Sequence, residues 1–349
     1  MKVMRLLSSL KHDESERGIF HLGRALVKRG HTSIIVSSAD KEHELVKRLE
    51  RDGNIYHQLS LEKKSWMALR QIWPLRQLIE KYQPDIIHLH SRTPAWILHW
   101  ALKGAKLKHK PKLVSTMYGF YPLNNYSRAL LNVDCTITVS DSVSEYLLQG
   151  IKEVKKPPRS IIRIYRGVDT RNFPYRYNPS VYWIHRTFAE YPELEHKKWL
   201  LFPTVIGQEY GQEWLIDILG NLSEDFPNLH IIIMDEDSRR DVVHEEFMQR
   251  VNALELRDKF TFIGTKRNDM REWLAAANLV LGLANQPESI GINVLQAIHL
   301  GTPVVGWNKA AFHEILKPLY PQGLVKEETA YALCKVIRNQ LETVMRPPI

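Results

Sequence analysis

Residues 286–306 combine side chains and spacings that suit a phosphorylated ligand. The stretch reads QPESIGINVLQAIHLGTPVVG, with Glu288 and Gly291 in a loop ahead of an apolar run, residues 294–300, that has helical spacing. A glycine and a proline then end the predicted helix, and two valines begin a short buried strand. The first turn of a helix presents unpaired N–H groups, and the helix dipole favours anions. The stretch therefore predicts a loop, helix and strand at which a phosphate group can bind.

The loop and helix resemble a known family. Retaining, nucleotide-sugar-dependent glycosyltransferases of the GT-B class, family 4, carry P-E-x-F-G, a second Glu eight positions later, and A-x-x-x-G-x-P-V. Here Glu288 is the first glutamate and Gln296 stands at the second. The resemblance implies that Glu288 is the catalytic residue at the donor sugar, that Gly291 belongs to the donor site, and that Gln296 binds the ribose without charge. A helix cap and a tight turn would also explain Glu288 and Gly291.

The resemblance covers nearly the whole chain through motifs that are specific only in combination: LVKRGH, HSRTPAW, RGVD, PESIG and GTPVV. Within the family, the chain is most similar to lipopolysaccharide core biosynthesis glycosyltransferases. The resemblance implies an α/β fold of two Rossmann-like, doubly wound domains that face a central cleft. It also implies hexosyl transfer with retention of configuration, a nucleotide sugar as co-substrate, and no bound metal or other cofactor.

Several positions that serve the donor in the family carry other residues here. Two carboxylates replace a glycine pair in the first loop, where they would repel a diphosphate. A tyrosine replaces the histidine near the reacting sugar, and a phenol does not titrate near neutrality. Valine and tyrosine replace the arginine and lysine that stabilise the leaving diphosphate, and two alanines replace a later glycine pair. The altered positions are Asp13, Glu14, Tyr118, Val205, Tyr210, Ala310 and Ala311.

The same motifs imply further contacts with donor and acceptor. Lys266, Arg267 and Asp269 lie in a loop that resembles the family's G-H-R-S-D-V loop at the nucleotide base. Lys309, beside the two alanines, is the one nearby candidate to replace the lost cation. On the acceptor side the resemblance implies three residues, Glu16, Arg17 and Arg92.

These segments require a scaffold of alternating strands and helices. Apolar runs predict strands at residues 3–9, 33–37, 86–89, 112–116, 135–139, 161–164, 200–202, 230–234, 260–263 and 304–305. Amphipathic spacing predicts helices at residues 16–29, 63–81, 241–254, 294–300 and 330–344, the last packing back towards the first domain. Pro157 and Pro158 indicate a linker. We predict an acceptor-side domain over residues 1–165 and a nucleotide-sugar-side domain over residues 166–349.

Charge is spread unevenly between these halves. The chain has a formal net charge of +9, yet residues 1–165 hold 28 Lys and Arg against 15 Asp and Glu, and the remainder holds 20 against 24. The basic first half predicts an anionic partner, such as a phosphorylated glycolipid or a membrane surface, unless it is simply a solvated surface. Nucleic acid is not expected, because no aromatic and basic motif accompanies the charge.

Trp96 and Trp100 lie four apart on one predicted helix, ahead of a run of lysines. They are either core residues or interfacial anchors at a bilayer with anionic lipid, where each nearby basic residue contributes on the order of 1 kcal/mol. No run of about 18 apolar residues is present to span a membrane. The two cysteines are too few for a disulfide framework. We therefore expect a cytoplasmic protein that is either free or peripheral on the inner membrane face.

Two hypotheses of function follow. The first is an enzyme that transfers a hexosyl group to a lipid-linked lipopolysaccharide core acceptor. The second is a catalytically inactive pseudo-glycosyltransferase that binds an anionic glycolipid or a catalytic glycosyltransferase partner, because the donor cations are missing. Epimerisation of a nucleotide sugar is a weaker third hypothesis, since it needs the same diphosphate site.

Overall fold

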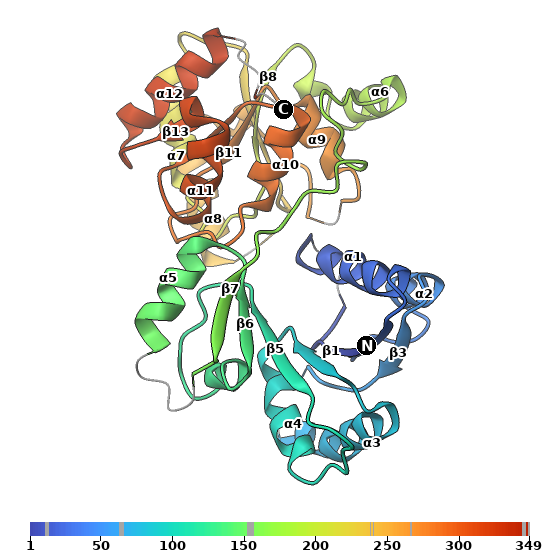
Figure 1. Cartoon of the computed structure of the whole chain (residues 1–349). Helices are drawn as coiled ribbons and strands as arrows, with labels where there is room; N and C mark the ends of the chain where they lie inside the picture. Colours follow the sequence, from blue (N-terminus) through green and yellow to red (C-terminus); the bar gives the residue numbers. More distant parts are fainter. Residues whose placement is uncertain are drawn as a thin grey trace. The chain divides into compact units, whose positions relative to one another are not determined.

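The computed structural model divides the chain into two compact units, Met1–Arg166 and Gly167–Ile349. The residues it describes are 1–10, 14–62, 66–151, 157–237, 239, 241–265, 267–343 and 347, with backbone alone for 14–17, 66 and 67. Each unit is built around one parallel sheet (Figure 1). The predicted α/β fold of two Rossmann-like domains is confirmed at this level.

The first unit contains a seven-stranded sheet in the order β3-β2-β1-β4-β5-β6-β7, counted over the described residues. Each neighbouring pair is parallel, as in the register Met4 to Ile34 and Met4 to Ile87. Consecutive strands β1, β2 and β3 run outwards on one side of β1, and the chain then returns to its other side at β4. The strands are β1 (Lys2–Leu6), β2 (Thr32–Ser37), β3 (Ile55–Gln58), β4 (Ile86–Leu89), β5 (Lys112–Met117), β6 (Cys135–Thr138) and β7 (Ser160–Arg163).

Helices connect these strands, and the predicted elements did not include the segments 44–51, 55–58, 127–130 and 141–150. The short helix α2 and the edge strand β3 carry weak periodic signals because each spans few residues. The predicted helix over residues 63–81 is a 3-10 segment, η1, followed by α3, whose Pro74 lies in the first turn where proline is tolerated. Residues 63–65 of that prediction lie outside the described residues. The helical segments are α1 (Glu14–Lys28), α2 (Glu44–Arg51), η1 (Trp66–Gln71), α3 (Ile72–Tyr82), α4 (Arg92–Leu102), η2 (Ser127–Leu130) and α5 (Asp141–Gly150).

The second unit repeats this plan with a six-stranded sheet in the order β10-β9-β8-β11-β12-β13, again counted over the described residues. Its strands are β8 (Lys198–Phe202), β9 (Leu229–Ile233), β10 (Phe260–Phe262), β11 (Leu279–Gly282), β12 (Val304–Trp307) and β13 (Leu324–Val325). Its helical segments are α6 (Val181–Glu190), η4 (Pro192–Leu194), α7 (Glu213–Leu222), α8 (Val242–Ala253), η5 (Arg257–Lys259), α9 (Met270–Ala276), α10 (Ile292–Leu300), α11 (Ala310–Leu319), η6 (Pro321–Gly323) and α12 (Ala330–Glu342).

Strand β8 shows why the strands of these sheets have continuous apolar sequences. Leu200 and Phe202 are fully buried in the cluster that includes α7, α8 and α12. Leu201, between them, is fully buried in the cluster on the other face, with residues of α9, α10 and α11. A parallel strand covered on both faces needs apolar side chains at every position. The doubly wound packing therefore follows from the local sequence.

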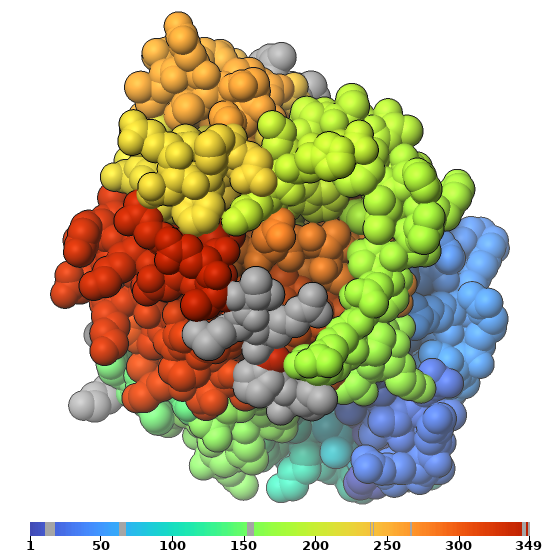
Figure 2. Space-filling view, turned by 90° about the horizontal axis from the view of Figure 1, so that it is seen from above, coloured from blue at the N-terminus to red at the C-terminus, as the bar shows by residue number. Residues whose placement is uncertain are grey.

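The segment after residue 167 lies along the surface of the second unit, next to α9 and α10 (Figure 2). Arg176 N donates to Leu300 O at 2.9 Å, and Tyr177 OH donates to a carboxylate oxygen of Glu272 at 3.1 Å. Arg271 Nη1 donates to Asn172 O at 3.2 Å. These bonds attach the connecting segment to the second unit.

The final helix, α12, packs on α7 and β13 within the second unit. Ile337 is fully buried there, and Arg338 forms an ion pair with Asp225. The predicted end of this helix at residue 344 lies outside the described residues, and its packing towards the first unit stays a prediction. None of the helices among the described residues is both long enough and apolar enough to cross a membrane.

Candidate functional site

The second sheet has its topological switch point between β8 and β11, where the strand order reverses. Open α/β sheets bind ligands outside the carboxyl ends of the strands at such a point. A small cavity of about 120 Å³ lies there, beside the loops that follow the two strands and the first turn of α10. It is lined by residues 203–204, Tyr210, residues 281–284, Glu288, residues 291–294 and Phe312.

One asparagine ties the two loops of this site together. Asn285 donates from its backbone nitrogen to Glu209 O at 2.9 Å and from its side-chain Nδ2 to Glu213 Oε1 at 2.5 Å. Its side-chain oxygen accepts from Trp214 Nε1 at 3.2 Å. The sequence offered no motif for this contact, because its partners lie more than 70 positions away. The mouth of the cavity is therefore held by side chains that the motif comparison missed.

Glu288 lines the cavity, and its carboxylate also holds its own loop, while its catalytic role stays a prediction. Its Oε1 accepts from Ser289 N at 3.1 Å and from Ile290 N at 3.4 Å. Gly291 follows with φ of 60°, a left-handed conformation that glycine adopts without strain, and caps α10. A Cβ at this position would also lie 3.0 Å from Ile315 Cδ1. The structure brings Glu288 and Gly291 together as a pre-shaped loop at the start of a helix.

The positions where the family has arginine and lysine contribute no charge to the cavity. Tyr210 lines it, whereas Val205 does not. Gly211, next to Tyr210, has φ of 77°, and a Cβ there would lie 2.0 Å from Leu283 O. Among the described lining residues there is no Lys, Arg or His. A diphosphate would thus meet a tyrosine ring and apolar walls in place of two cations.

Lys309 is near this site but is already engaged. Its Nζ donates to Asn285 O at 2.6 Å and forms an ion pair with Glu328 at 3.3 Å. Ala310, which follows, has φ of 44°, a left-handed conformation that costs a residue with a Cβ roughly 1–2 kcal/mol. Ala311 donates from its amide nitrogen to Glu288 O at 3.1 Å. Lys309 would have to leave both partners to reach a phosphate.

Gln296 is buried, with 2% of its surface exposed, and is not among the residues that line the cavity. It lies within α10, in the core of the second unit. Its side chain is thus largely shielded from solvent in the observed conformation. The predicted ribose contact stays a prediction.

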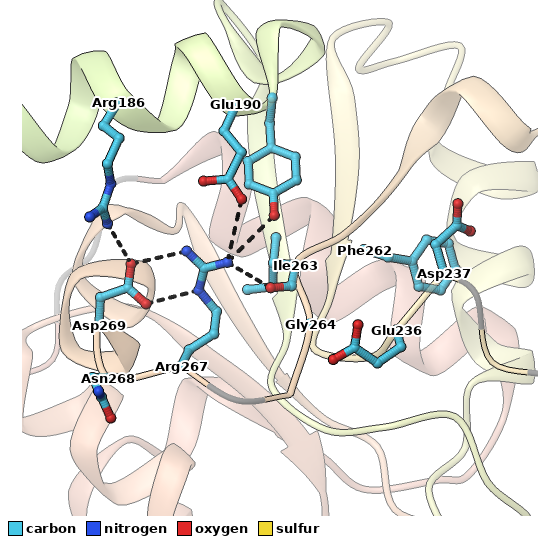
Figure 3. A pocket seen from close by; sticks show the side chains of 11 residues that line it. Arg186, Glu190, Glu236, Asp237, Phe262, Ile263, Gly264, Arg267, Asn268 and Asp269 are labelled. Carbon is cyan, nitrogen blue, oxygen red and sulfur yellow. Dashed lines mark hydrogen bonds and ion pairs between the residues drawn. The ribbon is translucent and has the colours of Figure 1, made fainter.

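A larger cavity, of about 880 Å³, lies beside the loop predicted to hold the nucleotide base (Figure 3). Arg267 points from this loop towards Asp269 and donates to it through Nε at 2.8 Å and Nη2 at 3.1 Å. Arg267 Nη1 also donates to Ile263 O at 2.6 Å. On the other side of Asp269, Trp183 Nε1 donates at 2.8 Å and Arg186 at 3.1 Å. Arg267 and Asp269 hold the loop against α6.

The charge of Asp269 is stabilised by this network. Burial alone would raise the pKa of its carboxyl group, but the hydrogen bonds from Arg267 and Trp183 outweigh burial and lower it. An ionised Asp269 keeps Arg267 in place. A base in this cavity would thus meet residues 263–264 and the neighbouring Glu236. Lys266 lies outside the described residues.

Asp235, at the carboxyl end of β9, is a further residue that sequence comparison missed. It is 1% exposed, and it accepts from Ile206 N at 2.8 Å and from Arg239 Nη1 at 3.0 Å. These bonds connect the end of β9 to the loop that carries Val205 and Tyr210. The sequence offers one signal for this residue, because Asp235 is an acidic residue that closely follows the run of isoleucines in β9.

The first sheet has its switch point between β1 and β4, and Tyr118, which replaces the family's histidine, follows the neighbouring strand β5. Its hydroxyl lies 2.7 Å from Nδ1 of His90. Burial raises the pKa of Tyr118 to about 12 and lowers the pKa of His90 well below its ordinary value, so both groups are neutral at physiological pH. An imidazole is thus present next to the altered position, from the HSRTPAW motif.

Arg92, predicted on the acceptor side, is enclosed by aromatic rings. Its guanidinium lies 4.9 Å from the ring centroid of Tyr121 and 5.1 Å from that of Tyr126. Nη1 donates to Ser127 Oγ at 3.4 Å. Asp13 and the side chains of Glu14, Glu16 and Arg17 lie outside the described residues, so their predicted roles stay predictions.

Trp96 and Trp100, on α4, are 39% and 41% exposed. The hypothesis that both are core residues is therefore wrong, because the face of α4 that carries them is open to solvent. Lys103 Nζ lies 3.8 Å from the ring centroid of Trp100.

Two family models match consecutive parts of the chain. Glycosyltransferase Family 4 matches residues 15–172, and Glycosyl transferases group 1 matches residues 184–343. With two parallel Rossmann-like sheets, these matches define the GT-B class of glycosyltransferases. The chain belongs, within that class, to the glycosyltransferases of the family 4 and group 1 type.

Individual relatives are distant. The chain is 23% identical over 311 residues to the N-acetyl-alpha-D-glucosaminyl L-malate synthase of Bacillus anthracis, covering 85% of this chain and 76% of that one. It is 24% identical over 342 residues to a phosphatidylinositol N-acetylglucosaminyltransferase subunit of Homo sapiens, covering 93% of this chain. The match spans 65% of that human protein, a little under two thirds of its length.

Solved structures show the same fold. A glycosyltransferase from Rickettsia africae ESF-5 superposes with a TM-score of 0.79 at 21% identity, over 98% of this chain and 88% of that one. WaaG, a glycosyltransferase involved in lipopolysaccharide biosynthesis, superposes with a TM-score of 0.67 at 16% identity, over 99% of this chain and 91% of that one.

Proposed function

We propose that this protein transfers a hexosyl group from a nucleotide diphosphate sugar to a lipid-linked lipopolysaccharide core acceptor, with retention of configuration. The observation that carries the proposal is the loop at the β11 end, where Glu288 and the left-handed Gly291 line a cavity at the start of α10. A carboxylate held by two backbone N–H groups beside a helix N-terminus can orient a sugar next to its phosphate.

The remaining roles follow from the placement of the residues. Residues 263–264 would receive the base, while Arg267 and Asp269 hold that loop against α6. Lys309 would exchange Glu328 for the diphosphate. Arg92, with Glu16 and Arg17, would serve the acceptor side.

The acceptor in this proposal is an anionic glycolipid at the inner face of the cytoplasmic membrane. The basic first half and the exposed Trp96 and Trp100 support a peripheral contact there. Trp and Tyr side chains favour the headgroup level of a bilayer, and basic residues favour anionic lipid. The neighbouring structure of WaaG supports the lipopolysaccharide acceptor only through its fold.

A second function is favoured by one specific observation, the lack of a cation among the described residues that line the β8–β11 cavity. Under this alternative the protein is a catalytically inactive pseudo-glycosyltransferase that binds the glycolipid or a catalytic glycosyltransferase partner. Removing a single preorganised charge at a reacting centre commonly costs two to three decades in rate, and two such charges are missing here.

Calorimetric and thermal-shift titrations with UDP, GDP, ADP and their sugar conjugates test the proposal. We expect one nucleotide to bind more tightly than the others, and transfer from its sugar conjugate to fall about a hundredfold in Glu288→Ala. Glu245→Ala, an exposed change on α8, is the control and should keep wild-type transfer. If a folded sample binds none of these ligands, the enzyme hypothesis fails and the pseudo-glycosyltransferase remains.

A further inference from the structure

A separate cavity of about 650 Å³ lies in the first unit, between α4 and η2. Its volume exceeds that of the β8–β11 cavity, and its lining residues include none of the donor-site residues and none of Glu16, Arg17 and Arg92. Its floor is apolar, and the side chains that form it come from two strands, one helix and η2. They are Leu89, Ala95, Leu98, Leu102, Leu113 and Ala129.

The rim of this cavity carries positive charge and an indole. Lys103 and Arg128 line it, together with Trp96 and two asparagines. Trp96 is held in place by a hydrogen bond from Nε1 to Tyr126 O at 3.1 Å, and Arg128 by a bond from Nε to Leu123 O at 3.2 Å. The described lining residues include no carboxylate. The cavity therefore combines an apolar floor with a rim that favours an anion.

The helix α4 that lines the cavity and the neighbouring α3 and η1 expose further large apolar side chains. Trp100 is 41% exposed on α4, and Trp73 and Leu69 are 62% and 55% exposed on α3 and η1. These helices lie side by side (Figure 1), and Arg76 of α3 donates to Ala101 O of α4 at 3.0 Å. Large exposed apolar side chains gathered on adjacent elements mark an interaction surface.

We propose that the cavity between α4 and η2 takes the hydrocarbon chain of an anionic lipid, with Lys103 facing its phosphate and Trp96 at the level of the headgroup. An apolar floor gains free energy only from an apolar ligand, and a rim without carboxylates selects a negative head. A tail-binding pocket on the exposed tryptophan face would hold the protein at the membrane. The proposal extends the lipid contact of the proposed function but does not depend on sugar transfer.

A chain-length series tests it directly. Lysophosphatidylglycerols of increasing chain length, each kept below its critical micelle concentration, are titrated calorimetrically into the full-length protein. Affinity should rise about fourfold per added methylene while the chain is being buried, and then level off when the cavity is filled. Glycerol 3-phosphate, which has the head but no chain, should bind far more weakly. Equal affinity for all chain lengths and for glycerol 3-phosphate would overturn the proposal.

Two matched pairs of variants locate the site. Ala129→Phe fills the cavity and should abolish the dependence on chain length, whereas Ala253→Phe, an exposed change on α8, should leave it intact. Lys103→Gln should weaken binding about fivefold, the effect of one basic residue near an anionic surface. Lys335→Gln, on the exposed face of α12, is its control. Identical binding in all four variants would contradict the assignment.

Photocrosslinking keeps the test valid if Ala129→Phe fails to fold. A lysophosphatidylglycerol with a diazirine near the end of its chain is bound to the wild-type protein, irradiated, and mapped by peptide mass spectrometry. Crosslinks within residues 89–103 and 113–132 support the proposal, and crosslinks spread over both units reject it. Nucleotide titration of the same samples separates the two proposals, since loss of donor binding would leave the crosslinks unchanged.

Discussion

The switch points of the two sheets occupy equivalent places in the topology but differ in chemistry. In the first unit the strand ends carry buried basic groups, with Arg5 fully buried and donating to Ile19 O at 2.5 Å. His88 and His90 lie beside it, with ring centroids 4.1 Å apart. In the second unit the corresponding ends carry Glu288 and the buried Asp235. One repeated architecture thus carries a buried arginine beside neutral histidines in the first unit and carboxylates in the second.

The difference shows that topology decides where a ligand can bind, while the side chains decide which ligand. Parallel strands end at a common edge, and loops diverge at the switch point in both units. In the second unit, the family's two phosphate-binding cations are absent at Val205 and Tyr210. Lys309 lies near this site but is paired with Glu328, and the described residues that line the cavity include no cation.

The largest expected effect concerns the loop that closes the second switch point. Gly211→Ala should lower the free energy of unfolding by about 3 kcal/mol, because its φ of 77° is strained for alanine and its Cβ would lie 2.0 Å from Leu283 O. Gly220→Ala, in α7 with no heavy atom within 4 Å of the added methyl group, should raise it by about 0.5 kcal/mol. Chemical denaturation measures both changes in the free energy of unfolding. Similar effects at the two glycines would contradict the expected backbone strain of an alanine at position 211.

The contrast between the two units should disappear if positive charge is introduced at the switch point of the second unit. Val205→Arg combined with Tyr210→Lys should raise affinity for nucleoside diphosphates about a hundredfold, because each charge-assisted hydrogen bond contributes about 1.5–3 kcal/mol. Isothermal titration with UDP, GDP and ADP measures the gain.

The control is Val205→Met with Tyr210→Met, which changes shape without adding charge and should leave affinity at the wild-type level. If the charged double variant shows no gain in nucleotide affinity, the small size of the cavity limits donor binding, and the lack of charge does not.

Per pH unit, the smallest expected effect is a pH dependence that sharpens the contrast. Burial lowers the pKa of His88 to about 3 and that of His230, in the second unit, to about 4. These histidines are neutral in the folded chain and take up a proton in the unfolded chain below about pH 6.5. Stability is therefore lost as pH falls from about 6.5 towards 4, by at most about 1.4 kcal/mol per pH unit for each histidine.

Thermal melting between pH 7 and pH 4 checks this slope. His88→Gln and His230→Gln should each flatten it, while His185→Gln, exposed on α6, should not. The first unit also holds His90, whose pKa burial lowers well below the ordinary value. We therefore expect unfolding of the first unit to be more sensitive to acid than unfolding of the second unit. A slope that is the same in all three variants would remove histidine burial as its cause.

Much of the scaffold could be predicted from the sequence because its signals are local. The isoleucines of β9 and the leucines of β8 are buried on both faces, so every position in these strands is apolar or nearly so. Glu288 and Gly291 were also predictable, since loop, cap and helix are neighbours in the chain. The predicted elements did not include the helices α2, α5, α6, α7, α9 and α11 or the strands β3, β11 and β13, and short segments such as β3 and β13 carry little periodic signal.

By itself the sequence determined two parallel α/β units, the Glu288 loop and the basic character of the first half, because these depend on local periodicity, turn residues and composition. Only the tertiary structure decided which predicted groups are available to a ligand. Lys309 is paired with Glu328, Gln296 is buried, and Arg267 holds Asp269. Such pairings join residues that are not linked by any local pattern, so their outcome depends on how the folded elements bring charges and cavities together.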